Sequence, residues 1–99
     1  MRLISYSTKP ESASENRSKI EAVFAELHDA RIADFAYTVV QGPDGSFWHL
    51  VEGTPAAMAA FQALPAFEAF STTAPERQLA PSTRRDVVIV GSYGKLVRQ

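Results

Sequence analysis

The sequence predicts a β-hairpin in the stretch Phe35-Ala-Tyr-Thr-Val-Val-Gln-Gly-Pro-Asp-Gly-Ser-Phe-Trp-His-Leu-Val-Glu52. Pro43 suits the second position of a type I turn, and Gly45 can adopt the positive φ that follows it. The residues between Gly42 and Ser46 are therefore expected to form a three-residue loop with a bulge. If Gly42 faces Ser46, the pairs across the hairpin are Gln41–Phe47, Val40–Trp48, Val39–His49, Thr38–Leu50 and Tyr37–Val51.

This register gives the hairpin two faces, because successive side chains of a strand point to opposite sides. One face carries Phe35, Tyr37, Val39, Phe47, His49 and Val51. The other carries Ala36, Thr38, Val40, Trp48, Leu50 and Glu52. Large apolar residues occur on both, so each face is expected to be covered by another layer of protein.

Length and composition predict a single domain over residues 1–99. The chain has 99 residues, of which 45% are hydrophobic, so it can bury a core without metals or disulfides. It has no cysteine, which excludes thiolate chemistry and gives no sign of an oxidising compartment. No apolar run approaches the ~20 residues of a membrane span, and the first residues turn polar too soon for a signal peptide. The expected location is the cytoplasm, with no membrane partner.

The charge balance argues against nucleic acid as a partner. The net charge is -1, and a nucleic-acid-binding surface needs a concentrated basic patch. The basic residues of the second half are interpreted as a dispersed, solvated set: Arg77, Arg84, Arg85, Lys95 and Arg98.

The segment before the hairpin predicts a strand and a helix. The strand runs from Arg2 to Thr8 and ends before Pro10, which cannot donate to a sheet. Ser12 and Glu15 have the spacing of a capping box, so a helix is expected from about Ala13. Its apolar stripe contains Ile20, Val23, Phe24 and Leu27, and Asn16 lies in the same stripe one turn earlier.

The segment after the hairpin predicts a broken helix and a last strand. Thr54-Pro55 is a strong helix start, and Pro65 is expected to interrupt the helix and restart it. The predicted elements are a helix over Ala56–Ala63, its continuation from Pro65 towards Thr73, a surface connection over Thr73–Thr83 and a strand over Asp86–Val90. The last strand is apolar throughout, which is typical of a strand covered on both faces.

The predicted order is strand, helix, strand, strand, helix, strand. This is the ferredoxin-like α+β arrangement βαββαβ, with a four-stranded antiparallel sheet and the helices on one face. The helices cannot cover the face that carries Val40, Trp48 and Leu50. We therefore expect a homodimer packed sheet to sheet, with the end of the last strand or the tail touching the partner.

The chain resembles the dimeric α+β barrel superfamily, and within it the small proteins related to antibiotic-biosynthesis monooxygenases. The resemblance lies in Glu15-Asn16 before Ile20-Glu-Ala-Val-Phe-Ala-Glu-Leu27, Asp44-Gly-Ser-Phe-Trp-His49, Leu64-Pro-Ala-Phe-Glu-Ala-Phe70 and Val90-Gly-Ser-Tyr93. It implies a dimeric barrel in a superfamily whose members include cofactor-independent oxygenases of aromatic polyketides, haem-degrading enzymes and small proteins without a known activity. Trp48 matches the tryptophan of these oxygenases, whereas Asp44 stands in the neighbourhood of their asparagine. The superfamily's haem degraders use a histidine in the second half of the chain, and none follows His49.

Other chemistries find no support in the sequence, so no metal and no cofactor are expected. The two histidines, His28 and His49, are too few for a convincing metal site. No Gly-rich phosphate loop follows a strand, and no Gly-x-Ser-x-Gly elbow occurs.

Strand alternation and helical periodicity place two polar residues on inward-facing positions. These two residues are the catalytic candidates. His49 lies on the helix-facing side of its strand, and Asn16 lies on the sheet-facing side of its helix. Burying either without a partner would cost about 1–3 kcal/mol, so each must find hydrogen bonds. They are expected to meet, directly or across a ligand. Two interpretations stay open: a structural pair, or an acid/base histidine oriented by Asn16.

The aromatic residues between helices and sheet are the ligand-binding candidates, namely Phe24, Tyr37, Phe61, Phe67 and Phe70. The sequence favours a small dimeric protein that binds a hydrophobic or aromatic molecule there. The alternative is a non-enzymatic structural or interaction dimer in which these rings are only core.

Overall fold

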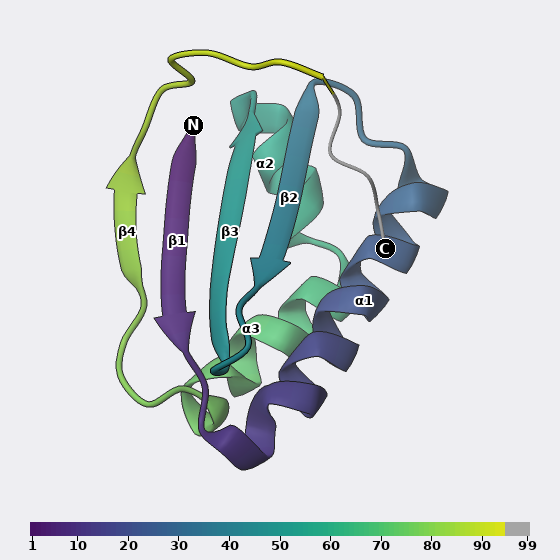
Figure 1. Ribbon diagram of the computed structural model, residues 1–99. Coiled ribbons are helices and arrows are strands. Elements are labelled where there is room, and N and C mark those ends of the chain that lie inside the picture. The colour runs from purple at the N-terminus through teal and green to yellow at the C-terminus, as the bar shows by residue number, and fades with distance from the viewer. Residues whose placement is uncertain (95–99) are drawn as a thin grey trace.

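The computed structural model describes residues 1–94, and in it three α-helices cover one face of a four-stranded antiparallel sheet (Figure 1). The strands are β1 (Arg2–Ser7), β2 (Phe35–Gln41), β3 (Ser46–Gly53) and β4 (Thr83–Asp86), in the order β2-β3-β1-β4. The helices are α1 (Ala13–Ala30), α2 (Pro55–Gln62) and α3 (Pro65–Arg77), with a 3-10 turn at Pro10–Ser12 before α1. The predicted α+β class and ferredoxin-like strand order are confirmed.

The hairpin has the register that its turn predicts. Val39 pairs with His49, Val40 with Trp48 and Tyr37 with Val51. The Gly42 amide donates to the Ser46 carbonyl at 2.8 Å, and Gly45 has the positive φ of 83°. The Asp44 carboxylate accepts from the Ser46 amide and holds the turn from within. The sheet is therefore aligned by a short local sequence.

The core lies between the sheet and the helices. Phe47 on β3 and Val23 on α1 are each only 1% exposed, and aromatic rings from α2 and α3 close the layer around them. Tyr6 and Phe47 stack with their ring centroids 5.6 Å apart. Rings from β1, β2, β3 and all three α-helices thus form one continuous aromatic layer.

The starts of α1 and α2 differ in how their caps are built. Thr54 caps α2 as predicted, with its hydroxyl accepting from the Ala57 amide at 3.1 Å. α1 begins at Ala13 as predicted, but the Ser12 side chain makes no capping hydrogen bond. Ser12 already has helical backbone angles because it closes the 3-10 turn that runs directly into α1. The predicted capping box is therefore wrong, although the helix start is right.

The predicted surface connection over Thr73–Thr83 is wrong in its first part, because α3 continues to Arg77. Pro75 lies inside the helix and removes one backbone donor near its C-terminal end. The Arg77 side chain donates to the Phe70 carbonyl and the Thr73 hydroxyl of the same helix and to Asn16 Oδ1 on α1. Tertiary contacts therefore extend a helix that the local sequence would end.

The predicted last strand over Asp86–Val90 is also wrong, because β4 ends where that prediction begins. Arg2 pairs with Asp86, and one further bond joins the Val87 amide to the Met1 carbonyl at 2.9 Å. Residues 88–94 lie in no strand, and Val88 and Val90 are 82% and 98% exposed. Pairing with β1, and not hydrophobicity, decides where β4 lies.

The face of the sheet away from the helices is open and apolar in part. Val40 is 49% exposed and Trp48 is 40% exposed, side by side in paired positions of β2 and β3. Leu50 on the same face is half-buried. Across residues 1–94, no helix combines the length and hydropathy needed to cross a membrane. The predicted basic residues Lys95 and Arg98 lie outside the described residues.

Candidate functional site

Five polar side chains form one hydrogen-bonded chain inside the protein. The Tyr37 hydroxyl contacts His49 Nδ1 at 2.6 Å, and His49 Nε2 contacts the Tyr6 hydroxyl at 2.8 Å. Asn16 Nδ2 donates to the Tyr6 hydroxyl at 2.9 Å, and Arg77 Nε donates to Asn16 Oδ1 at 2.8 Å. Asn16 is 0% exposed, Arg77 2% and His49 4%, so the chain is shielded from water over most of its length.

Strand register brings the three rings of this chain together. His49 on β3 lies opposite Val39 on β2 and opposite Ile4 on β1. Tyr37 and Tyr6 are each two residues from those partners, so they are the diagonal neighbours of His49 on the helix-facing side. The two-residue alternation of three adjacent strands therefore places the hydroxyls against the two nitrogens of one imidazole.

Arg77 fixes the orientation of the Asn16 amide and with it the direction of the Asn16–Tyr6 hydrogen bond. A guanidinium is only a donor, so the Asn16 oxygen must accept and its NH₂ group must donate to Tyr6. The Tyr6 hydroxyl is buried, and a proton without an acceptor would be costly there, so we infer that Tyr6 donates to His49 Nε2. A neutral His49 therefore carries its proton on Nδ1 and donates it to the Tyr37 oxygen. The Tyr37 hydroxyl proton has no acceptor within hydrogen-bonding distance among residues 1–94.

Burial keeps the three rings uncharged at neutral pH. Desolvation lowers the pKa of His49 to about 4, because the imidazolium form would lose its hydration. Desolvation also raises the pKa of Tyr6 to about 12, against smaller lowering effects from Asn16 and Arg77. The pKa of Tyr37 is raised for the same reason, with a further contribution from Tyr6. His49 is thus a neutral acceptor and donor rather than an acid at pH 7.

A cavity of about 180 Å³ opens beside this chain, between the sheet and helices α2 and α3. Tyr6, Tyr37 and His49 line its polar wall. Its apolar wall consists of the aromatic and aliphatic side chains Ile4, Val51, Met58, Phe61, Phe67 and Phe70. Tyr37 lines this cavity, so its side chain can contact a molecule bound there.

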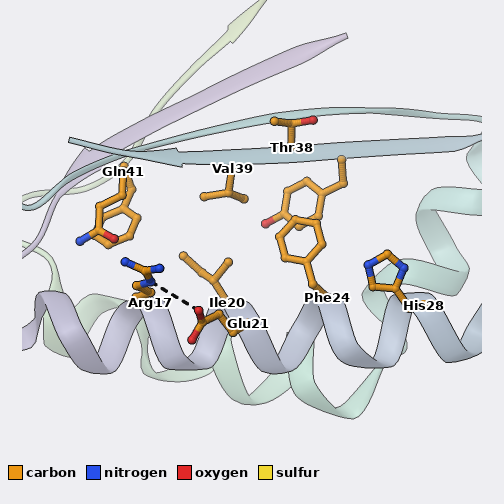
Figure 2. Close-up of a pocket in the computed structure, with 10 residues that line it drawn as sticks. Arg17, Ile20, Glu21, Phe24, His28, Thr38, Val39 and Gln41 are labelled. Atoms are coloured by element: carbon orange, nitrogen blue, oxygen red, sulfur yellow. Dashed lines mark hydrogen bonds and ion pairs between the residues drawn. The ribbon is translucent and has the colours of Figure 1, made fainter. Parts of the chain in front are cut away.

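A larger groove of about 480 Å³ lies on the other side of Tyr37, between α1 and β2 (Figure 2). The Phe24 ring stacks on the Tyr37 ring with centroids 5.0 Å apart and planes 11° apart. Arg17 and Glu21 face each other at the rim, 3.4 Å apart. His28 lies near the far end of the groove and makes no contact with the buried chain. The groove is therefore wide and polar at its rim, and His49 does not line it.

The structure brings most of the candidate site residues together. His49 and Asn16 do not touch; the Tyr6 hydroxyl lies between them and bonds to both. Tyr37, Phe61, Phe67 and Phe70 line the cavity beside His49. Phe24 lines the α1–β2 groove instead, separated from the cavity by Tyr37.

Two members of the chain were absent from the sequence candidates. Tyr6 could have been found, because two-residue alternation along Arg2–Thr8 puts it on one face with Ile4. Arg77 gave no such signal, since it follows two threonines and a proline in what looked like a loop. Its interpretation as a solvated residue is wrong, because α3 turns it inwards above the Phe70 ring, with Cζ 5.2 Å from the centroid.

The described part of the chain holds no group of three histidine or acidic side chains placed to bind a metal ion. His49 uses both ring nitrogens in hydrogen bonds to tyrosines. The side chains at this site provide hydrogen bonds and aromatic contacts.

Comparisons with known proteins give a clear likeness in structure alone. No protein-family model and no curated protein sequence matches the chain. Rv0793 from Mycobacterium tuberculosis superimposes with a TM-score of 0.73 at 10% identity, over 94% of this chain and 96% of that one. A candidate antibiotic biosynthesis monooxygenase from Nitrosomonas europaea also gives 0.73, at 11% identity over 94% and 91%. One from Caulobacter crescentus CB15 gives 0.70, at 14% identity over 89% and 88%.

These identities are far too low to transfer an activity, but the superposition spans nearly the whole of each chain. The strand order, the single helix-covered face and these neighbours agree with one another. The chain has the same fold as these solved structures, two of which carry the name of antibiotic biosynthesis monooxygenase.

Proposed function

We propose that this protein binds a small aromatic molecule in the cavity between its sheet and helices α2 and α3. The supporting observation is the Tyr37 hydroxyl, whose proton has no acceptor among residues 1–94 and which borders a cavity lined by aromatic rings. A pocket that combines apolar walls with a few convergent polar groups is the usual form of a ligand site.

The size of the cavity limits what it can take. A cavity of roughly 150 Å³ in another protein is known to bind benzene. The 180 Å³ available here suits a single aromatic ring with a small substituent. The proposed ligand is therefore monocyclic.

A catalytic role is the extended form of this proposal. Several proteins with this fold carry the name of antibiotic biosynthesis monooxygenase. In a cofactor-independent oxygenation, a bound phenol would supply the electrons: one oxygen atom of O₂ enters the ring to give a quinone, and the other leaves as water. His49 would act as the proton acceptor of the site, with Asn16 and Tyr6 orienting it.

A non-enzymatic structural dimer is the competing function, and one observation favours it. The side chains of the hydrogen-bonded series from Arg77 to Tyr37 are partners for one another. Among the described side chains, no buried polar atom is left without a hydrogen-bond partner. A network of this kind also serves to fix α1 and α3 on the sheet.

Filling the cavity tests the proposal. Ala74 on α3 lines the cavity, and Ala69 on the same helix is exposed. Phenol titrated into ¹⁵N-labelled protein should shift amide signals around His49 and Phe70 in the wild type and in Ala69→Leu. The same titration should leave Ala74→Leu unchanged, because the added side chain occupies the space. Absence of any shift in the wild type would overturn the proposal, and oxygen uptake with bound phenol would separate an enzyme from a binding protein.

A further inference from the structure

The cavity has a positively charged mouth. Arg2 on β1 and Arg84 on β4 both line it, and no aspartate or glutamate among residues 1–94 does. The carboxylate nearest to Arg2 is that of Asp86, at 3.8 Å, and both side chains of that pair are more than half exposed. Exposed pairs of this geometry contribute little, so both guanidinium groups remain available to a ligand.

Strand pairing places the two arginines on the same sheet face as His49. Ile4 on β1 pairs with His49 on one side and with Arg84 on the other, so these three residues form one row across the sheet. Strands lie about 4.8 Å apart, which puts the Cα atoms of His49 and Arg84 roughly 10 Å from each other. Arg2 is the diagonal neighbour of Arg84 on the same face. β4 forms the edge of the sheet farthest from α1, so this end of the row faces outwards (Figure 1).

A third positive charge lies behind the apolar wall. Arg77 is 2% exposed and makes no ion pair with a described carboxylate; its hydrogen bonds go to Asn16, Thr73 and the Phe70 carbonyl. Fields from buried charges are weakly screened, so Arg77 favours negative charge in the cavity. A ligand that fits this cavity would therefore present oxygen acceptors both to the Tyr37 hydroxyl inside and to the arginines at the mouth.

We propose that the ligand is a monocyclic aromatic carboxylate. Its carboxylate pairs with Arg84 and Arg2 at the mouth, its ring lies between Phe61, Phe67 and Phe70, and an oxygen at its inner end accepts from Tyr37. Arginine suits this role because its planar fork can bind a carboxylate through two parallel hydrogen bonds. The inference rests on the proposed aromatic-binding function and adds the charge of the ligand to it.

The test compares benzoate with benzamide, which has the same shape and no charge. Arg84→Gln removes one of the two positive charges at the mouth and leaves Arg2. Arg85→Gln is the matched control, because Arg85 is the next residue of β4, points to the opposite face and does not line the cavity. Dissociation constants from NMR titrations at low salt should show benzoate bound about tenfold more tightly than benzamide by the wild type and by Arg85→Gln.

In Arg84→Gln the preference for benzoate should shrink, because only Arg2 remains at the mouth, and the benzamide affinity should be unchanged. Equal binding of both ligands by the wild type would overturn this inference while leaving the proposed aromatic site intact. The same loss of benzoate affinity in Arg84→Gln and Arg85→Gln would also overturn it, because diffuse surface charge would then explain the preference. Failure of both ligands to bind would overturn the proposed function itself.

Discussion

A neutral histidine at position 49 makes the folded state sensitive to acid. The groups that face its ring are the hydroxyls of Tyr6 and Tyr37, with the Arg77 charge behind Asn16. The pKa of Tyr6 is raised to about 12 and that of Tyr37 is also raised, so neither tyrosine titrates in the acid range. Protonation of His49 would also leave the Tyr6 hydroxyl without an acceptor.

We expect the free energy of unfolding to fall as the pH drops below 6.5. The pKa of His49 is about 4 in the folded protein and 6.5 without burial, so between these values the unfolded chain binds a proton that the folded chain does not. The stabilisation is complete above pH 6.5 and decreases by about 2 kcal/mol on going to pH 5. Urea unfolding of the wild type and of His28→Gln should both show this loss, whereas His49→Gln should not. A stability that is constant from pH 7 to pH 5 in the wild type contradicts the prediction.

The residues of the buried chain differ in how far the sequence could reveal them. Inward positions for His49 and Asn16 follow from strand alternation and helical periodicity, and both side chains are buried. Their connection through Tyr6 required the pairing of β1 with β3, which is a long-range property. Arg77 required knowledge of where α3 ends, and that is decided by the contacts of Arg77 itself.

At the scale of elements, the hairpin turn also holds β1 in place. The Thr8 amide donates to the Gly45 carbonyl at 2.9 Å, and the buried Thr8 hydroxyl donates to the same oxygen at 3.3 Å. A β-carbon at position 45 would lie 3.1 Å from the Thr8 hydroxyl oxygen. Gly45 therefore forms the hairpin turn and also binds the end of β1 through Thr8. The local turn pattern predicted only the first of these roles.

Gly45→Ala should destabilise the protein by about 1–3 kcal/mol. The cost has two sources, the positive φ of 83° and the contact with Thr8. Gly91→Ala is the control, because a β-carbon there meets no atom within 4 Å and the backbone has no positive φ. Thermal unfolding followed by circular dichroism should show a lower midpoint for Gly45→Ala alone. Equal midpoints for both variants would contradict this account of the turn.

The edges of the sheet show why local sequence is a weak guide to β4. The apolar run Val87–Val90 looked like the better strand, whereas the residues that pair with β1 are Thr83, Arg84, Arg85 and Asp86. Backbone hydrogen bonds do not depend on side-chain polarity, and β4 as an edge strand has one side free for charged residues. The exposed valines that follow are consequently unexplained by the fold of one chain.

The sheet has one face covered by helices and one uncovered face. We expect a second copy of the protein to pack on the uncovered face. Val40, Trp48 and Leu50 share the face that no helix reaches, and Leu3 lies on it opposite Leu50. Val88, Ile89 and Val90 add further exposed apolar surface. Monomeric proteins seldom expose such surface in one contiguous patch.

Leu50→Lys should convert a symmetric, sheet-to-sheet homodimer into a monomer. Apolar burial contributes roughly 25 cal/mol per Å², and an unpaired charge at the centre of the interface would have to be desolvated without a partner. The dissociation constant of the dimer should therefore rise at least about 100-fold. Ala59→Lys introduces the same charge on an exposed position of α2 and should leave the dimer intact. Light scattering at micromolar concentration distinguishes these cases, and a wild type that is already monomeric would show that the open face has another use.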